Sequence, residues 1–159
     1  MIVYHGSMRE IEAPRVTYSM PYVDFGPGFY VTTVKEQAER WAIRKAMRFG
    51  GKATVSCYNV GDMFAFRVCE FADADADWLR FVAECRNGSD AYKQYDVITG
   101  KVANDDVFKC VNMFMDGYWD EERTLREIRY FKNYDQIAFI TQEAIDALVV
   151  FRESYGVTR

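Results

Sequence analysis

The 159-residue sequence contains a single histidine, His5, and this scarcity excludes several kinds of site. Metal centres built on clustered imidazoles and nucleophilic triads with a distant histidine have only this one ring to use. The cysteines lack the paired short spacing of zinc ligands, because they stand at four distant positions: Cys57, Cys69, Cys85 and Cys110. We therefore expect reduced, buried thiols and no metal.

Long apolar runs and charge of one predominant sign are also missing. No segment approaches membrane-spanning length, and the N-terminus has neither the basic start nor the cleavage site of a signal peptide. Net charge is -4, with no basic run that would follow a phosphate backbone. These absences predict a cytoplasmic protein, and they leave a nucleic acid open only as a transient substrate.

Repeats, low-complexity tracts and linkers are absent too, and half of the residues are hydrophobic. A chain of this length can bury a real core, so we expect one domain over residues 1–159. Apolar periodicity predicts strands at residues 2–5, 29–32, 53–58, 63–68, 95–98 and 135–140. It predicts helices at residues 33–50, with a capping box of Thr33 and Glu36, and at residues 73–85, 104–117, 120–130 and from 141. This mixed order favours an α+β fold over a doubly wound sheet.

His5 stands where the first strand gives way to Gly6 and Ser7. A lone histidine is commonly structural. A glycine beside it, however, lacks Cβ and lets a ligand approach the backbone. Both interpretations of His5 stay open at this point.

A second glycine-rich segment, residues 26–28, precedes the strand that begins at Phe29 and Tyr30. It lacks the lysine and the following helix of a phosphate-binding loop, so we do not expect one here. Successive strand residues face opposite sides, so one of the two aromatic rings packs while the other is free to stack on a ligand.

Three segments together resemble the N-terminal half of an ADP-ribosyltransferase domain. They are residues 4–7 (Tyr-His-Gly-Ser), residues 24–32 (Asp-Phe-Gly-Pro-Gly-Phe-Tyr-Val-Thr), and Gln37-Ala38 with Trp41-Ala42. More closely, the chain is similar to a bacterial family of uncharacterised domains assigned to that superfamily. The similarity continues through residues 95–100, 103–106 and 135–139, so it covers nearly the whole chain.

The resemblance implies split antiparallel sheets with flanking helices and an NAD molecule in the groove between them. In the superfamily's histidine-tyrosine-glutamate pattern, His5 matches the residue that binds the adenosine-side ribose, and Gly6 the one whose backbone holds the nicotinamide amide. Tyr30 matches the tyrosine that stacks on nicotinamide. The cofactor-binding set implied in this way is His5, Gly6, Ser7, Gly28, Phe29, Tyr30 and Thr32.

The third position of the pattern departs from the family, because the last strand offers Gln136 where the transferases place a catalytic glutamate. Cleavage of the nicotinamide bond passes through an oxocarbenium-like state, which a carboxylate stabilises better than an amide. Asp135 faces the opposite side of a regular strand. Asp105 and Asp106 are alternative acids, although helix capping explains them equally well.

Two functions follow from these residues. The first is an enzyme that transfers ADP-ribose from NAD to a protein, nucleic acid or small molecule, or that hydrolyses NAD, with His5, Tyr30 and Gln136 as its catalytic group. The second is a non-catalytic module of the same fold that binds NAD, another nucleotide, or a protein partner such as an antitoxin. An α+β domain whose glycines and aromatics are purely structural is the remaining alternative. Acceptor specificity would lie in the loops at residues 8–23 and 92–104.

Overall fold

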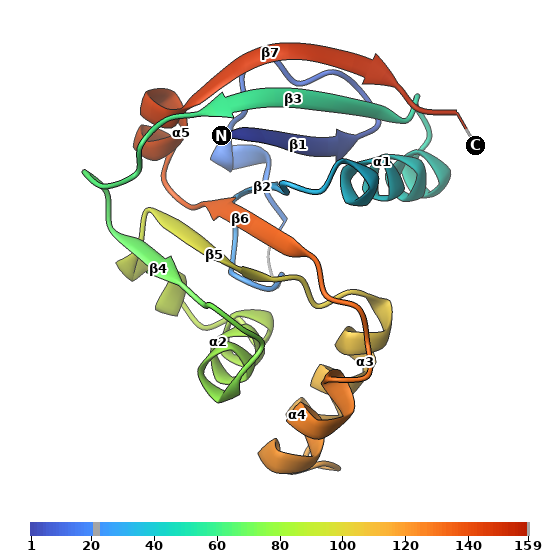
Figure 1. Ribbon diagram of the computed structural model, residues 1–159, viewed down its shortest axis with the longest axis vertical. Helices are drawn as coiled ribbons and strands as arrows, with labels where there is room; N and C mark the ends of the chain where they lie inside the picture. The colour runs from blue at the N-terminus through green and yellow to red at the C-terminus, as the bar shows by residue number, and fades with distance from the viewer. Residues whose placement is uncertain (21–22, 159) are drawn as a thin grey trace.

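The computed structural model describes residues 1–20 and 23–158, and its strands form two separate sheets (Figure 1). The first sheet has the order β1-β3-β7 and is antiparallel throughout. The second has the order β2-β6-β5-β4 and is antiparallel except for the pairing of β4 with β5. The strands are β1 (Ile2–Ser7), β2 (Phe29–Val31), β3 (Thr54–Val60), β4 (Val68–Glu70), β5 (Val97–Lys101), β6 (Asp135–Phe139) and β7 (Val149–Gly156). The expected α+β class with split sheets is confirmed.

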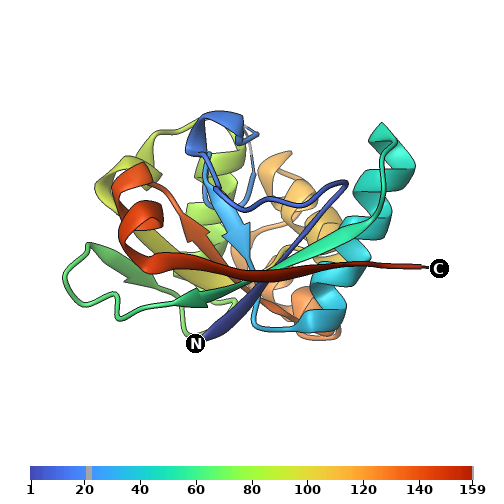
Figure 2. The same cartoon turned by 90° about the horizontal axis from the view of Figure 1, so that it is seen from above.

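The helices flank the two sheets on different sides (Figures 1 and 2). Helix α1 packs against β1 and β3 of the first sheet, whereas α2, α3 and α4 gather beside the second. Helix α5 leads from β6 into β7. The helices are α1 (Lys35–Phe49), α2 (Ala76–Arg86), α3 (Asp105–Met115), α4 (Glu121–Ile128) and α5 (Gln142–Leu148), with short 3-10 turns at Val16–Tyr18 and Ala91–Gln94.

Strand alternation divides the core between two sides of the second sheet. On β2, Phe29 and Val31 are buried in a cluster that also holds Val3 and Tyr58 of the first sheet, so this side lies between the sheets. Tyr30 instead packs in a cluster with residues of α2 and α3. The expectation that Phe29 and Tyr30 face opposite sides is therefore confirmed, but neither ring is left free to stack on a ligand, because both pack inside the protein.

The two sheets are joined at one antiparallel bridge between Tyr4 of β1 and Thr32. The Tyr4 N–H donates to the Thr32 carbonyl at 2.9 Å, and the Thr32 N–H donates back at 3.0 Å. Beyond this bridge β1 pairs with β3 and β2 pairs with β6, so the chains diverge. The bridge thus places His5 and Tyr30 at the point where the sheets separate.

Several predicted boundaries are wrong. Helix α1 begins after Val34 without a side-chain cap, because the Thr33 hydroxyl donates to Asp135 instead. Residues 63–66 form a turn closed by a hydrogen bond from the Phe66 N–H to the Met63 carbonyl at 2.9 Å, and the strand follows later, at Val68–Glu70. Strand β7 was not predicted. Of the loop at residues 8–23, positions 21 and 22 lie outside the described residues.

All four cysteines are free. Three of them are buried and Cys69 is half-buried, in agreement with the expectation of buried thiols. Among the described helices, none combines the length and the apolar character needed to cross a membrane.

Candidate functional site

His5 lies in the wedge between the two sheets. Its ring Nδ1 is 2.6 Å from the main-chain carbonyl oxygen of Tyr30, and its centroid lies 4.6 Å from that of the Phe29 ring. The side chain is only 8% exposed. The residue therefore ties the end of β1 to β2 through its ring.

The charge and tautomer of His5 follow from these contacts. Burial, supported by the nearby positive charge of Lys45, lowers the pKa of His5 from its usual 6.5 to about 3, so the ring is neutral at pH 7. Because a carbonyl oxygen can only accept, Nδ1 carries the proton and donates it to Tyr30. Nε2 then keeps its lone pair, since the hydrogen bond that the ring makes within the described residues is the one from Nδ1. It is the remaining hydrogen-bond acceptor of the ring.

This pKa predicts an acid dependence of stability. The folded protein resists protonation of His5 while the unfolded chain does not, so the unfolded state binds more protons and stability falls as the pH drops from 6.5 toward 3. At pH 5 the unmodified protein should lose about 2 kcal/mol, relative to pH 7.5, beyond the loss of a His5→Asn variant. Denaturant unfolding of both proteins at the two pH values measures this difference. Equal losses in the two proteins would show that His5 titrates normally.

Tyr30 is held by its hydroxyl. The Tyr30 O–H donates to the Gly26 carbonyl at 2.6 Å and accepts from the Phe25 N–H at 2.9 Å. Burial, with the nearby charge of Asp24, raises its pKa well above the ordinary value, so the hydroxyl stays protonated. Tyr30 therefore orders the glycine-rich turn that precedes its own strand.

Close packing against neighbouring elements explains the two glycines beside the junction, Gly6 and Gly28. A Cβ on Gly6 would come within 2.0 Å of the Ala38 carbonyl oxygen, so only glycine lets β1 approach α1 this closely. A Cβ on Gly28 would come within 2.8 Å of the Phe139 carbonyl oxygen on β6. The Gly6 carbonyl accepts a hydrogen bond from Lys45 Nζ at 2.9 Å. The space beside Gly6 is therefore filled by α1, and the space beside Gly28 by β6.

Ser7 and Thr32 close the two ends of the junction, and both are buried. Ser7 ends β1 opposite Thr54. The Thr32 hydroxyl donates to Asp135 at 3.1 Å and accepts from the Val34 N–H, which fixes the start of α1. Asp135 and Gln136 therefore serve different sides of β6, as the strand alternation predicted.

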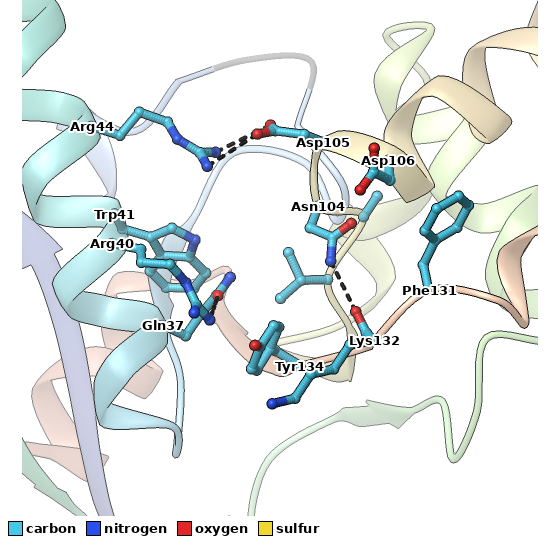
Figure 3. Close-up of a pocket in the computed structure, with 12 residues that line it drawn as sticks. Gln37, Arg40, Trp41, Arg44, Asn104, Asp105, Asp106, Phe131, Lys132 and Tyr134 are labelled. Carbon is cyan, nitrogen blue, oxygen red and sulfur yellow. Dashed lines mark hydrogen bonds and ion pairs between the residues drawn. The ribbon is translucent and has the colours of Figure 1, made fainter.

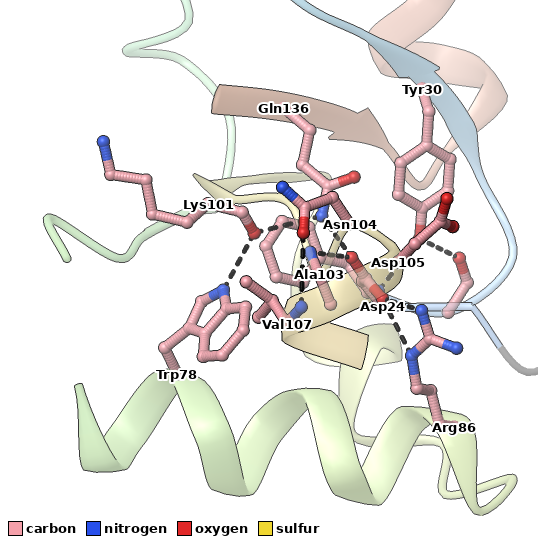
Figure 4. A network of polar contacts seen from close by, with 12 residues as sticks. Asp24, Tyr30, Trp78, Arg86, Lys101, Ala103, Asn104, Asp105, Val107 and Gln136 are labelled. Carbon is pink, nitrogen blue, oxygen red and sulfur yellow. Dashed lines mark hydrogen bonds and ion pairs between the residues drawn. The ribbon is translucent and has the colours of Figure 1, made fainter. Parts of the chain in front are cut away.

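Gln136 belongs to a buried polar network centred on Asp24 (Figure 4). Its Nε2 donates to Asp24 Oδ2 at 2.8 Å and to the Lys101 carbonyl at 3.2 Å. The Ala103 N–H donates to the same Asp24 oxygen at 2.9 Å, and Arg86 pairs with the other oxygen, Nε at 2.8 Å. Among the described residues, four donor atoms from α2, β6 and the segment before α3 therefore fix one buried carboxylate, and the Gln136 amide supplies one of them.

Beside this network lies a cavity of about 350 Å³ between α1 and the segments that precede α3 and β6 (Figure 3). Two of its residues, Arg40 and Arg44, come from α1, and Lys132 and Tyr134 come from the segment before β6. Trp41 lines the cavity and also packs on Gly6. A Cβ added at Gly6 would come within 2.9 Å of the Trp41 Cβ. The cavity is therefore next to the His5 strand, although His5, Tyr30 and Gln136 do not line it.

The structure brings His5 and Phe29 into contact and sets Tyr30 and Gln136 on the same face of adjacent strands, because Tyr30 pairs with Ala138. The cavity residues were missed by sequence reasoning. Arg40 and Arg44 stand four positions apart, a spacing that puts them on one helix face and offers a usable signal. Lys132 and Tyr134 precede a strand in an irregular segment, and no pattern singles them out.

The chain matches the family described as "Protein of unknown function (DUF3990)" over residues 1–150, and it therefore belongs to that family. No curated protein and no solved structure matches it.

Proposed function

We propose that this member of the family binds NAD at the junction of the two sheets and transfers ADP-ribose from it to an acceptor. The acceptor is a protein, a nucleic acid or a small molecule, and nicotinamide is the leaving group. The resemblance of residues 4–7 and 24–32 to ADP-ribosyltransferases motivates the choice of NAD. The state of His5 carries the proposal on physical grounds.

His5 is suited to bind a ribose. Its Nδ1 donates to Tyr30, so the ring is fixed, and its neutral Nε2 accepts a hydrogen bond from a ribose hydroxyl. A protonated ring would present a second donor instead and would lose this preference. Tyr30 contributes the main-chain carbonyl that fixes the His5 ring, while its own aromatic ring packs on the other face of β2, toward α2 and α3.

The reaction itself breaks the bond between ribose C1′ and the nicotinamide nitrogen. The bonding electron pair leaves with nicotinamide, the acceptor's nucleophilic atom forms the new bond to C1′, and the acceptor releases a proton. The positive charge that develops on the ribose is stabilised by a nearby negative charge or by the negative end of a dipole. Gln136 is buried on the Tyr30 face of β6 instead of beside His5, and its side-chain carbonyl is only a dipole, so we expect turnover to be slow and to depend mainly on binding and orientation.

The test measures NAD affinity and nicotinamide release in the unmodified protein and in a His5→Asn variant. Asparagine can keep the donor to the Tyr30 carbonyl while removing Nε2, so it separates binding from folding. We expect the variant to fold and to bind NAD about tenfold more weakly, the effect of one well-placed hydrogen bond. Equal NAD affinities for the two proteins, or no NAD binding by either, would contradict the proposal.

A second function, NAD binding without turnover, is favoured by one observation. Both hydrogen bonds that the Gln136 amide donates go to Asp24 and to a main-chain carbonyl, an arrangement that suits a structural residue. Such a module would recognise NAD, a related nucleotide, or a protein partner such as an antitoxin. Saturable NAD binding with no nicotinamide release above the uncatalysed rate would decide for it.

A further inference from the structure

The cavity beside α1 has an excess of positive charge that the protein does not neutralise. Its charged lining consists of Arg40, Arg44, Lys132, Asp105 and Asp106. Each acid has its own cation: Asp105 pairs with Arg44 at 3.1 Å and Asp106 with Lys109 at 3.8 Å. Within the described part of the chain, Arg40 and Lys132 have no acidic partner within ion-pair distance.

Arg40 and Lys132 are held together by one aromatic ring. The Arg40 guanidinium carbon lies 4.6 Å from the centroid of Tyr134, and Lys132 Nζ lies 5.1 Å from the same centroid. Arg40 also donates to the neutral amide oxygen of Gln37 at 3.0 Å. Neutral groups thus position the two cations without neutralising their charge. Figure 3 shows their side chains beside Tyr134.

The two cations also favour a negative charge on the hydroxyl oxygen of Tyr134. Hydrogen bonding to Arg40, with a further contribution from Lys132, lowers the pKa of the Tyr134 hydroxyl. A phenolate is an anion, so the two cations stabilise an anionic oxygen at this point in the cavity. The neighbouring rings of Trp41 and Phe131 add apolar surface to the lining.

We propose that this cavity binds a phosphate or diphosphate group through Arg40 and Lys132. Guanidinium and ammonium groups are the usual partners of phosphate oxygens, and the aromatic brace limits the side-chain entropy lost on binding. The proposal builds on the function proposed above, because the phosphate belongs either to NAD held by the adjacent junction or to a phosphate-bearing acceptor. The shared chemistry is a phosphate ester or anhydride.

The experiment titrates inorganic pyrophosphate, ADP-ribose and NAD into the unmodified protein and into Arg40→Gln and Lys132→Gln variants by calorimetry at low salt. The matched controls are Arg123→Gln and Lys35→Gln. Arg123 stacks on Trp119 at 4.6 Å and Lys35 on Tyr155 at 4.8 Å, so they lose similar contacts outside the cavity. We expect each cavity variant to bind pyrophosphate about tenfold more weakly and the controls to bind it normally.

The two sources of phosphate give different results. If the cavity takes the diphosphate of NAD, NAD affinity falls in the cavity variants and pyrophosphate competes with NAD. If it takes an acceptor's phosphate, pyrophosphate binding falls while NAD affinity stays unchanged. Absence of pyrophosphate binding, or equal pyrophosphate affinity in cavity and control variants, overturns the inference. Pyrophosphate binding that depends on Arg40, with no NAD binding at all, overturns only the proposed NAD function.

Discussion

An Arg86→Met variant should lose about 3 kcal/mol of stability, because it leaves a buried carboxylate without its ion-pair partner. The ion pair of Arg86 with Asp24 is buried, with side-chain exposures of 18% and 6%. The guanidinium also lies 3.9 Å from the Phe108 ring centroid, so its removal costs packing as well. What dominates is the Asp24 carboxylate, which would remain buried without its counter-charge. Equilibrium unfolding in urea measures the loss.

The matched control for this substitution lies on the same helix. Arg80 forms a hydrogen-bonded pair with Glu121, but Arg80 is exposed to solvent and Glu121 is only half-buried. An Arg80→Met variant should therefore change stability little or not at all. An Asp24→Asn substitution added to Arg86→Met should restore part of the loss, because it removes the unpaired charge. Equal losses for Arg80→Met and Arg86→Met would contradict the importance of the network.

A Gln136→Glu variant should lose about 2 kcal/mol at pH 8, although the substitution restores the residue that the transferase pattern prefers. The Gln136 amide donates to Asp24 at 2.8 Å, and a carboxylate at that place has no proton to donate. Two carboxylates would then face each other in a buried site. Urea unfolding of this variant and the unmodified protein gives the difference.

The loss should depend on pH in a defined direction. Repulsion by Asp24 raises the pKa of the introduced carboxyl in the folded protein above its ordinary value of about 4.3. The folded state then binds more protons than the unfolded one, so the variant's stability falls as the pH rises from 4.3 through that raised pKa. A Gln136→Met variant, the control, should show a loss that does not vary with pH. A pH-independent loss in Gln136→Glu would contradict the contact with Asp24.

Much of the fold follows from local sequence signals. Asn104, Asp120 and Thr141 each cap the helix that they were predicted to begin, because their side chains accept hydrogen bonds from main-chain N–H groups of the first turn. Strand β7 escaped prediction for a physical reason. It follows Leu148 of α5 without an intervening turn, and its pairing with β3 joins residues almost a hundred positions apart.

The candidate site was only partly predictable. His5 and Tyr30 stand out because glycines adjoin them, but the reasons for those glycines lie in α1 and β6, which local patterns do not place. The hydrogen bond between Asp24 and Gln136 could not be predicted from the sequence, because 112 positions separate the two residues. Tertiary contacts of this kind decide whether a polar residue is free to act or already bonded.

The proposed NAD site depends most directly on the lone pair of His5 Nε2. Because His5 is the only histidine, its ring nitrogens can be observed without assignment ambiguity in a ¹⁵N-labelled protein. We predict a neutral ring with the proton on Nδ1 at pH 7, and a shift of the Nε2 resonance alone when NAD is added. The proposed NAD site is contradicted if the Nε2 resonance does not change when NAD is added to saturating concentration. It is also contradicted if the ring is already protonated at pH 6.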